Sequence, residues 1–167
     1  RSPADVQVLA GLRETVASLN AKLQTLQNPT GRSLTPWLRA GDRVVVTEIL
    51  ERTLAPGLHR GLMGTIHAGI DGKLLLQTED GRSLTVDLAA ASVEPSYAMT
   101  VHRSQGSEWP CVLLVLDDTN FLSRNLVYTA FTRARSKVVI LSAKGVLGRA
   151  LRNVVQRHSA MSTRLLP

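Results

Sequence analysis

The stretch Cys111-Val112-Leu113-Leu114-Val115-Leu116 decides the fold class of this 167-residue chain. An apolar run without polar alternation is typical of a strand buried on both faces of a parallel sheet. A second such run covers residues 138–141, and Ser123 is suited to cap a helix between the two runs. The apolar positions of that helix are Leu126, Val127, Ala130, Phe131 and Ala134. Strand, helix and strand in this order predict an α/β fold with a parallel sheet.

Further α/β elements are expected on both sides of this unit. Residues 5–10 alternate like a short strand, and residues 97–101 are expected to form another. An apolar stripe at helical spacing follows the first strand and comprises Leu12, Val16, Leu19, Leu23 and Leu26. A second stripe runs from Val146 to Val155, and the tail from Arg157 to Pro167 is basic and less regular.

The middle of the chain has a different pattern. Short β-type runs occur at residues 44–46, 64–66, 74–77 and 84–86, with Asp-Gly pairs at 71–72 and 80–81. Asp-Gly is typical of hairpins, because their turns require positive φ. Short strands packed so closely along a chain predict a small barrel. We therefore expect residues 1–41 and 95–167 to form one α/β domain, and residues 42–94 to be an all-β insertion.

The basic charge is concentrated in the C-terminal part of the chain. Residues 1–94 carry ten Lys and Arg against ten Asp and Glu, whereas residues 95–167 carry ten against three. The whole formal net charge of +7 therefore lies in the second segment. Eight of its ten cations are Arg, the side chain that pairs bidentately with phosphate and carboxylate groups. A polyanion is therefore a partner to test.

Composition and motif searches exclude several classes of protein. Hydrophobic residues make up 44% of the chain, which is typical of a globular domain. Cys111 lies in an apolar run and is expected to be buried, and no cluster has zinc-ligand spacing. No apolar run approaches the ~18 residues of a membrane span, and the first residues do not resemble a signal peptide, so we expect a cytoplasmic domain. The chain has no Gly-x-x-x-x-Gly-Lys-Ser/Thr motif and is not expected to bind a nucleoside triphosphate in the P-loop manner by itself.

A polar stretch from Tyr97 to Pro110 is the first candidate for chemistry. Gly106 would let a ligand approach the backbone, and Trp109 is suited to stack on a base. The side chains that offer donors or acceptors to phosphate or sugar oxygens are Thr100, His102, Ser104 and Gln105. The alternative is a polar loop beside a buried tryptophan, and spacing alone does not separate the two.

The helix that follows supplies the second candidate. Arg133 comes three residues after Ala130, at the rim of the apolar stripe, where an arginine can point into a neighbouring site. Arg135 and Lys137 are interpreted instead as ordinary last-turn cations that the helix dipole favours.

These two stretches resemble motifs of one enzyme family. Thr100-Val101-His102-Arg103-Ser104-Gln105-Gly106-Ser107-Glu108 resembles motif V of the superfamily 1 helicases, and Val127-Tyr128-Thr129-Ala130-Phe131-Thr132-Arg133-Ala134-Arg135 resembles their motif VI. Residues 5–29 resemble the strand and helix that open the same domain, and residues 41–66 resemble its SH3-like insert. The chain is thus similar to the RecD-like (1B) branch, in a UvrD-like helicase C-terminal domain: RecA-like domain 2A with an SH3-like 2B insert.

The resemblance implies roles for individual residues. In this family two RecA-like domains close on ATP, and Arg133 matches the arginine that reaches the γ-phosphate. Gln105 and Gly106 match positions near the phosphates, and Glu108 matches a carboxylate that hydrogen-bonds the ribose. Arg13 falls where motif IV often has a phosphate-contacting arginine. The positions that match residues facing single-stranded DNA are Thr100, His102 and Ser104; His102 has the alternative of a hydrogen-bonded loop histidine.

The implied function is the C-terminal motor domain of an ATP-dependent 5′-3′ DNA helicase. ATP with Mg²⁺ is the implied cofactor, and the metal ligands are expected on an N-terminal RecA-like domain that this fragment lacks. We expect the fragment to be inactive alone and to have that domain and single-stranded DNA as partners. The alternatives are a catalytically retired domain that binds DNA or protein, against which Arg133, Gln105 and Glu108 count, and an adaptor built on the insert. The insert departs from the family at Arg60-Gly61-Leu62-Met63-Gly64, where relatives commonly have Asn-Gly followed by an acidic residue.

Overall fold

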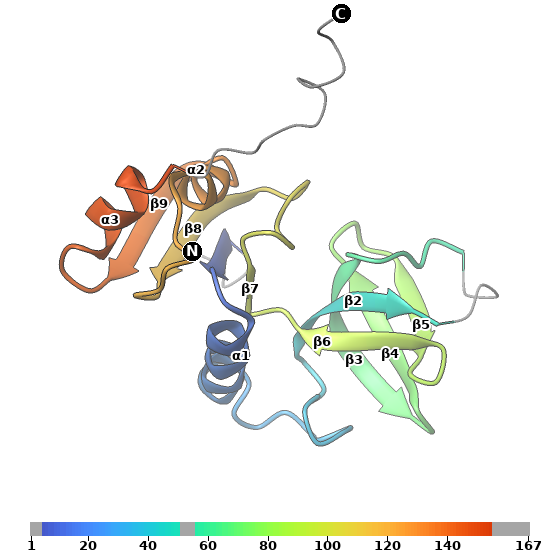
Figure 1. Cartoon of the computed structure of the whole chain (residues 1–167). Coiled ribbons are helices and arrows are strands. Elements are labelled where there is room, and N and C mark those ends of the chain that lie inside the picture. The colour runs from blue at the N-terminus through green and yellow to red at the C-terminus, as the bar shows by residue number, and fades with distance from the viewer. Residues whose placement is uncertain (1–4, 51–55, 155–167) are drawn as a thin grey trace, which may run out of the picture.

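A computed structural model describes residues 5–50 and 56–154, which form an α/β body and a β insert (Figure 1). The body contains a four-stranded sheet in the order β7-β1-β8-β9, and all its neighbouring strands are parallel. Its strands are β1 (Val6–Ala10), β7 (Ala98–Thr100), β8 (Trp109–Leu116) and β9 (Ala134–Ser142). Its helices are α1 (Arg13–Gln27), α2 (Arg124–Phe131) and α3 (Val146–Arg152). The predicted parallel α/β sheet is confirmed.

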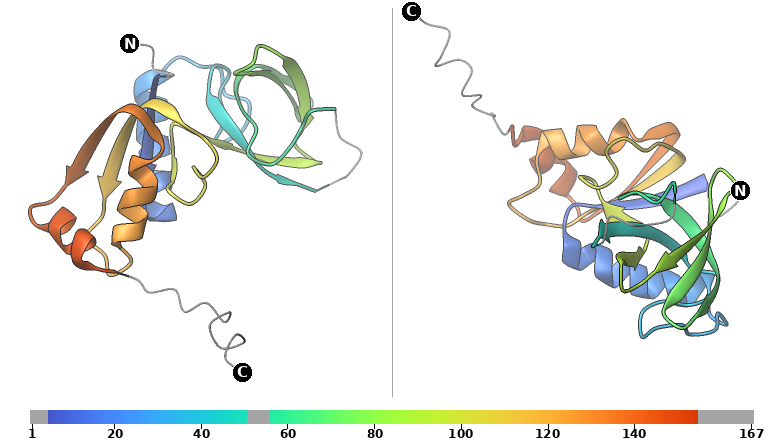
Figure 2. Two further views of the ribbon diagram at one scale, coloured as in Figure 1. Left: turned by 90° about the horizontal axis from the view of Figure 1, so that it is seen from above. Right: turned by 90° about the vertical axis from the view of Figure 1, so that its right-hand side faces the viewer.

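Helices cover both faces of this sheet. From β1 the chain proceeds to β7 on one side, and from β8 it proceeds to β9 on the other. Because crossovers between parallel strands are right-handed, these opposite directions place α1 and α2 on opposite faces. The right-hand view of Figure 2 shows the sheet between them. No helix among the described residues is long and apolar enough to cross a bilayer.

The run that predicted a buried strand forms the centre of the core. Val112 and Leu114 of β8 are fully buried and pack with Leu9, Val127 and Ala130 in one apolar cluster. Trp109 belongs to the same cluster and is only 4% exposed, so the structure supports the buried tryptophan over the base-stacking alternative. Cys111 is buried, as expected.

The structure corrects the end of the second predicted helix. α2 ends at Phe131, and Ala134 is instead the first residue of β9. The backbone N–H of Trp109 donates to the Arg133 carbonyl over 2.9 Å, which fixes the start of the β8–β9 ladder immediately after the helix. Arg135 and Lys137 therefore lie on a strand, and their interpretation as last-turn cations is wrong. α3 ends at Arg152, and the predicted position Val155 and the tail 157–167 lie outside the described residues.

The insert is a five-stranded antiparallel sheet in the order β5-β4-β3-β2-β6 with its own apolar core. Its strands are β2 (Arg43–Ile49), β3 (Met63–Ile70), β4 (Lys73–Thr78), β5 (Ser83–Asp87) and β6 (Ala91–Pro95). The four predicted runs lie in the first four strands, and β6 was not predicted. Asp71 and Gly72 form the expected turn with φ of 48° and 74°.

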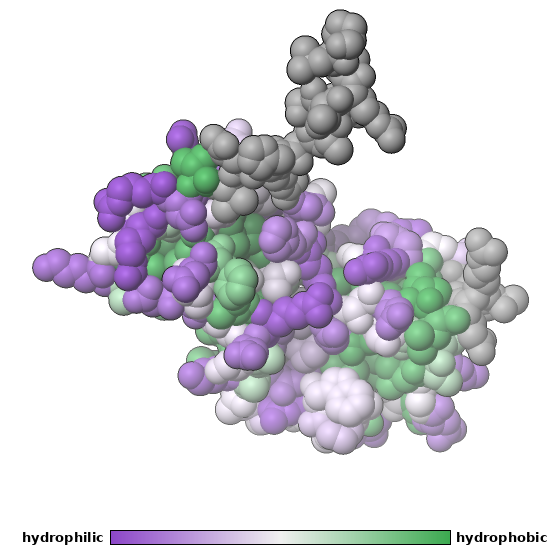
Figure 3. Space-filling view, viewed as in Figure 1, coloured by the Kyte–Doolittle hydropathy of each residue, from purple (hydrophilic) through white to green (hydrophobic). Residues whose placement is uncertain are grey.

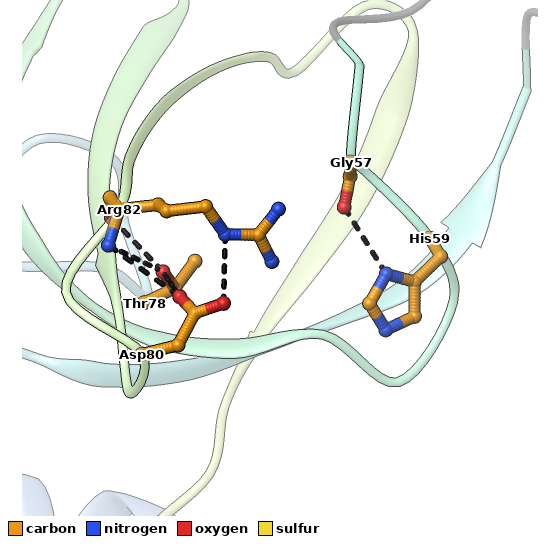
Figure 4. A network of polar contacts seen from close by, with 5 residues as sticks. All are labelled: Gly57, His59, Thr78, Asp80 and Arg82. Carbon is orange, nitrogen blue, oxygen red and sulfur yellow. Dashed lines mark hydrogen bonds and ion pairs between the residues drawn. The ribbon is translucent and has the colours of Figure 1, made fainter.

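Figure 4 shows how polar contacts close the turn between β4 and β5. Arg82 Nε donates to Asp80 Oδ2 over 2.7 Å, and the Arg82 backbone N–H donates to the Thr78 hydroxyl over 3.1 Å. The Thr78 hydroxyl also hydrogen-bonds Asp80, and this bond is the main cause that lowers the pKa of Asp80 below its ordinary value. His59 makes a separate contact of 3.1 Å with the Gly57 carbonyl.

Two passages of chain, residues 40–43 and 95–98, connect the insert to the body. They lie side by side, because the Ser96 N–H donates to the Arg43 carbonyl over 2.8 Å. Gln7 of β1 is fully buried beneath them and donates to the carbonyls of Ser96 and Tyr97. Arg43 Nη2 donates to Gln7 Oε1 over 3.1 Å, and burial lowers the pKa of this guanidinium.

Asp42 is the central acceptor of this junction. Its side chain is fully buried, and four donors surround its carboxylate: one from α1, two from the chain between α1 and the first passage, and one from the second passage. These donors are Arg39 N at 2.7 Å, Asn28 Nδ2 at 2.7 Å, Gln24 Nε2 at 2.5 Å and Tyr97 Oη at 2.9 Å. Burial, followed by the bond to Asp42, raises the pKa of Tyr97 far above its ordinary value. The network therefore joins the insert to the body through buried polar contacts.

Candidate functional site

The polar segment between β7 and β8 crosses the length of the sheet. At its start, Thr100 pairs with Ala10 at the carboxyl edge, and Val101 N donates to the Ala10 carbonyl. At its end, Trp109 lies at the amino edge beside Arg133. The candidate residues of this one segment are therefore divided between two opposite edges of the sheet.

Thr100 and His102 lie at the carboxyl edge. They line one cavity together with Arg13, which opens α1 directly after the carboxyl end of β1. His102 is exposed, and no hydrogen bond to its ring occurs within residues 5–50 and 56–154, so its DNA-facing role stays a prediction. Arg13 was predicted with the phosphate-binding group, but the structure places it with Thr100 and His102, on the edge opposite Arg133.

Ser104 differs from its expected orientation toward DNA. The side chain is fully buried, and its hydroxyl donates to the Val101 carbonyl over 2.7 Å. Small hydroxyl side chains commonly satisfy their own turn in this way. Ser104 therefore stabilises the segment from within and does not share the cavity of Thr100 and His102.

Gly106 allows the segment to turn toward the amino edge. Its φ of +89° lies in the region that L side chains rarely adopt, and a Cβ at this position would meet no neighbour within 4 Å. A side chain here would therefore strain the backbone without a steric clash. Gln105, immediately before it, is exposed.

Replacing Gly106 with alanine will lower the free energy of unfolding by about 1–2 kcal/mol, the cost of a left-handed L residue. Gly148→Ala is the matched control, because Gly148 lies inside α3 and its added Cβ would be 3.6 Å from Arg152 Nη1, an ordinary contact. We expect this control to be neutral or stabilising, since alanine favours helix. Urea denaturation of both variants measures the difference, and equal stability would contradict the backbone argument.

Arg133 lies at the amino edge and is fixed by three acceptors. Nη1 donates to the Ser107 carbonyl over 3.2 Å, so the guanidinium contacts the end of the crossing segment. Nε donates to the Thr129 carbonyl over 3.3 Å, and Nη2 donates to the Thr132 hydroxyl over 3.2 Å. The side chain is half-buried, and these bonds use only part of its five N–H donors. The geometry presents an oriented cation with donors free for an anion.

Glu108 is next to this group and is exposed. Arg135 Nε lies 3.4 Å from Glu108 Oε2, and both side chains are more than half exposed, at 66% and 53%. Such a pair contributes little energy, so the carboxylate is free to accept another donor. Within the described residues, no group of three His, Cys, Asp or Glu side chains is arranged to bind a metal ion. The site can bind an anion through the N–H donors of Arg133 and a hydroxyl group through the Glu108 carboxylate.

The family model of the UvrD-like helicase C-terminal domain matches residues 95–141, which contain the crossing segment and Arg133. This chain carries a UvrD-like helicase C-terminal domain. The domain is 39% identical over 146 residues to the ATP-dependent RecD2 DNA helicase of Deinococcus radiodurans, a match that covers 81% of this chain and 20% of the relative. It is 34% identical over 136 residues to the RecBCD enzyme subunit RecD of Mycobacterium tuberculosis, covering 78% of this chain and 23% of that subunit. The chain thus spans about a fifth of the length of these curated relatives.

The fold of this UvrD-like domain is also that of Pif1 helicases. The structure of a Bacteroides Pif1 helicase in complex with ADP-AlF3 and ssDNA superposes with a TM-score of 0.69 at 15% identity, covering 96% of this chain and 44% of that one. At this identity the likeness concerns the fold. It confirms the RecA-like sheet with an all-β insert, and the relatives confirm the predicted RecD-like family.

Proposed function

We propose that this UvrD-like domain is the second motor domain of an ATP-dependent 5′-3′ DNA helicase, with Arg133 as its arginine finger. In this proposal residues 1–41 and 95–167 form domain 2A, and residues 42–94 form the 2B insert. The name of one relative supports the ATP-dependent activity, since the ATP-dependent RecD2 DNA helicase is 39% identical to this chain over the aligned residues. The partner domain that closes on this one is an N-terminal RecA-like domain of the same protein.

The position of Arg133 carries the proposal. Phosphoryl transfer spreads charge over the oxygens of the transferred group, and a preorganised guanidinium stabilises that charge. The bonds to Ser107, Thr129 and Thr132 hold the Arg133 side chain at the amino edge while leaving it half-exposed. Arg133 is therefore positioned before any nucleotide arrives, so little side-chain ordering is needed on binding.

The crossing segment supplies the other contacts to ATP. The exposed residues Gln105 and Gly106 are suited to the phosphates, and the Glu108 carboxylate is suited to a ribose hydroxyl. When bound, ATP with Mg²⁺ supplies the bond that is hydrolysed. The Mg²⁺ ligands would come from the N-terminal RecA-like domain. The residues of this chain would bind and orient the nucleotide and neutralise charge on its phosphates.

The opposite edge is the proposed DNA side. Thr100 and His102 open onto a shared cavity, and Arg13 adds a cation there. We now group Arg13 with DNA and not with ATP, because it lies at the carboxyl edge. The buried Ser104 is a positioning residue in this proposal. The Pif1 structure of similar fold contains ssDNA, which supports single-stranded DNA as the ligand to test for this domain.

The chain will bind single-stranded DNA with an affinity that falls as salt rises, with a log–log slope of about −0.7 for each phosphate neutralised. Fluorescence anisotropy of a labelled oligo(dT) over a salt series measures this slope. His102→Ala will weaken binding, whereas His59→Ala is a matched control, because His59 is exposed on the insert and contacts its own turn. An affinity that is independent of salt would remove DNA from the ligands of this domain.

A further inference from the structure

A groove runs along α1 between the body and the insert. Its cavity of about 730 Å³ extends from Arg13 and His102 at the carboxyl edge to Trp37 and Arg60 at the insert. The α1 residues that line it run from Arg13 to Gln24 and cover ~17 Å, so the groove is long enough for several groups of an extended ligand. Figure 3 shows hydrophilic side chains gathered along the region between the two bodies.

Trp37 is the aromatic residue of this groove. Its side chain is 56% exposed, whereas Trp109, the other tryptophan of the chain, is 4% exposed. The backbone of Trp37 is held at both ends, because its carbonyl accepts from Gln24 Nε2 over 3.1 Å and its N–H donates to Thr35 Oγ1 over 3.3 Å. Leu38, the next residue, is fully buried in the insert core. The indole is thus exposed on a fixed backbone, and Leu38, not Trp37, fills the core at this point.

The charges around this indole are mainly positive. Arg13 and Arg60 line the groove, and no ion pair among the described residues engages either. Arg103 forms an exposed ion pair with Glu94 at 2.7 Å, which is a weak interaction that a phosphate can replace. Glu94 is the only carboxylate among the described residues that line the groove. Cations beside an exposed aromatic ring match the chemistry of single-stranded nucleic acid.

We propose that this groove continues the single-stranded DNA path from His102, with a base stacked on Trp37 and phosphates bound by Arg60 and Arg103. The inference rests on the proposed DNA function and adds residues to it. A base has two apolar faces and ionised phosphates on either side, which fit the indole and the flanking guanidinium groups. An acidic protein segment would use the cations but would not require a stacked base, so the test separates the two ligands.

Binding of oligo(dT) to the 167-residue chain will quench tryptophan emission, and Trp37→Ala will abolish the quenching because Trp109 is buried. The same substitution will weaken binding about tenfold, whereas Trp37→Phe will weaken it less, because phenylalanine keeps a stacking face. Leu26→Ala is the matched control, since Leu26 is 75% exposed on α1 and does not line the groove.

An oligonucleotide with abasic sites separates base stacking from phosphate contact. The unmodified chain will bind it about tenfold more weakly, and Trp37→Ala will add no further loss on this ligand. If Trp37→Ala weakens binding to both oligonucleotides equally, the stacking proposal is wrong. If His102→Ala weakens binding but Trp37→Ala does not, the groove proposal fails and the DNA function stands. If the unmodified chain does not bind oligo(dT), the DNA part of the proposed function fails first.

Discussion

Arg133→Ala in the full-length protein, tested under the proposed helicase function, will reduce DNA-stimulated ATP hydrolysis by about 10³–10⁵-fold, the contribution typical of an arginine finger. The guanidinium is held by Ser107, Thr129 and Thr132 in the folded domain, so its loss removes an oriented cation and not merely a surface charge. Steady-state ATPase assays with saturating single-stranded DNA measure the effect. Arg133→Lys will not restore full activity, because an ammonium lacks the planar fork that makes these contacts.

Arg135→Ala is the matched control for this experiment. Arg135 is two residues away, but its ion pair with Glu108 is exposed, so we expect turnover close to that of the unmodified enzyme. Thermal unfolding of each variant shows whether the fold survives. Near-normal hydrolysis by a folded Arg133→Ala enzyme would end the arginine-finger assignment and favour a retired, binding-only domain.

Asp42→Asn will lower the free energy of unfolding of this chain by about 2–4 kcal/mol. The partners of this buried carboxylate among the described residues are all donors, from Arg39 N to Tyr97 Oη. In asparagine, an NH2 group replaces one of the two acceptor oxygens. This NH2 group is a donor, so it faces at least one buried N–H or O–H donor and cannot form a hydrogen bond with it. Urea denaturation, followed by circular dichroism, measures the loss.

Asp71→Asn carries the same chemical change at an exposed position. Asp71 has a φ of 48° in the β3–β4 turn, a conformation that asparagine tolerates equally well, so we expect no loss of stability. Tyr97→Phe removes a single donor from Asp42 and will cost about 1 kcal/mol. Equal stabilities of Asp42→Asn and Asp71→Asn would show that the junction network does not stabilise the fold.

Apolar runs predicted most strands, because a buried strand shows its apolar residues in its own sequence. Such a strand can be recognised without knowledge of the strand it pairs with. β6 escaped prediction for the opposite reason. Its five residues, 91–95, contain two small residues, a glutamate and a proline, and they become a strand only by pairing with β2. The end of α2 was extended too far, since Ala134 suits a helix and only the pairing of β8 with β9 assigns it to a strand.

The motif residues were found from the sequence, but their grouping was not. One continuous motif, residues 100–108, is divided between two edges because the segment crosses the sheet, and this depends on strand order. Ser104 has the polarity of a ligand residue, yet its hydroxyl is used by the Val101 carbonyl. Asp42 was not singled out from the sequence, because nothing local indicates that four donors converge on it.

The adjacency of the two passages at Arg43 and Ser96 has an evolutionary consequence. Because the Ser96 N–H donates to the Arg43 carbonyl over 2.8 Å, the chain between these two residues leaves and re-enters the body at nearly the same point. The four parallel strands do not require that excursion to be any particular length. During evolution, the insert can therefore be exchanged, lengthened or shortened while the parallel sheet of the body keeps its architecture.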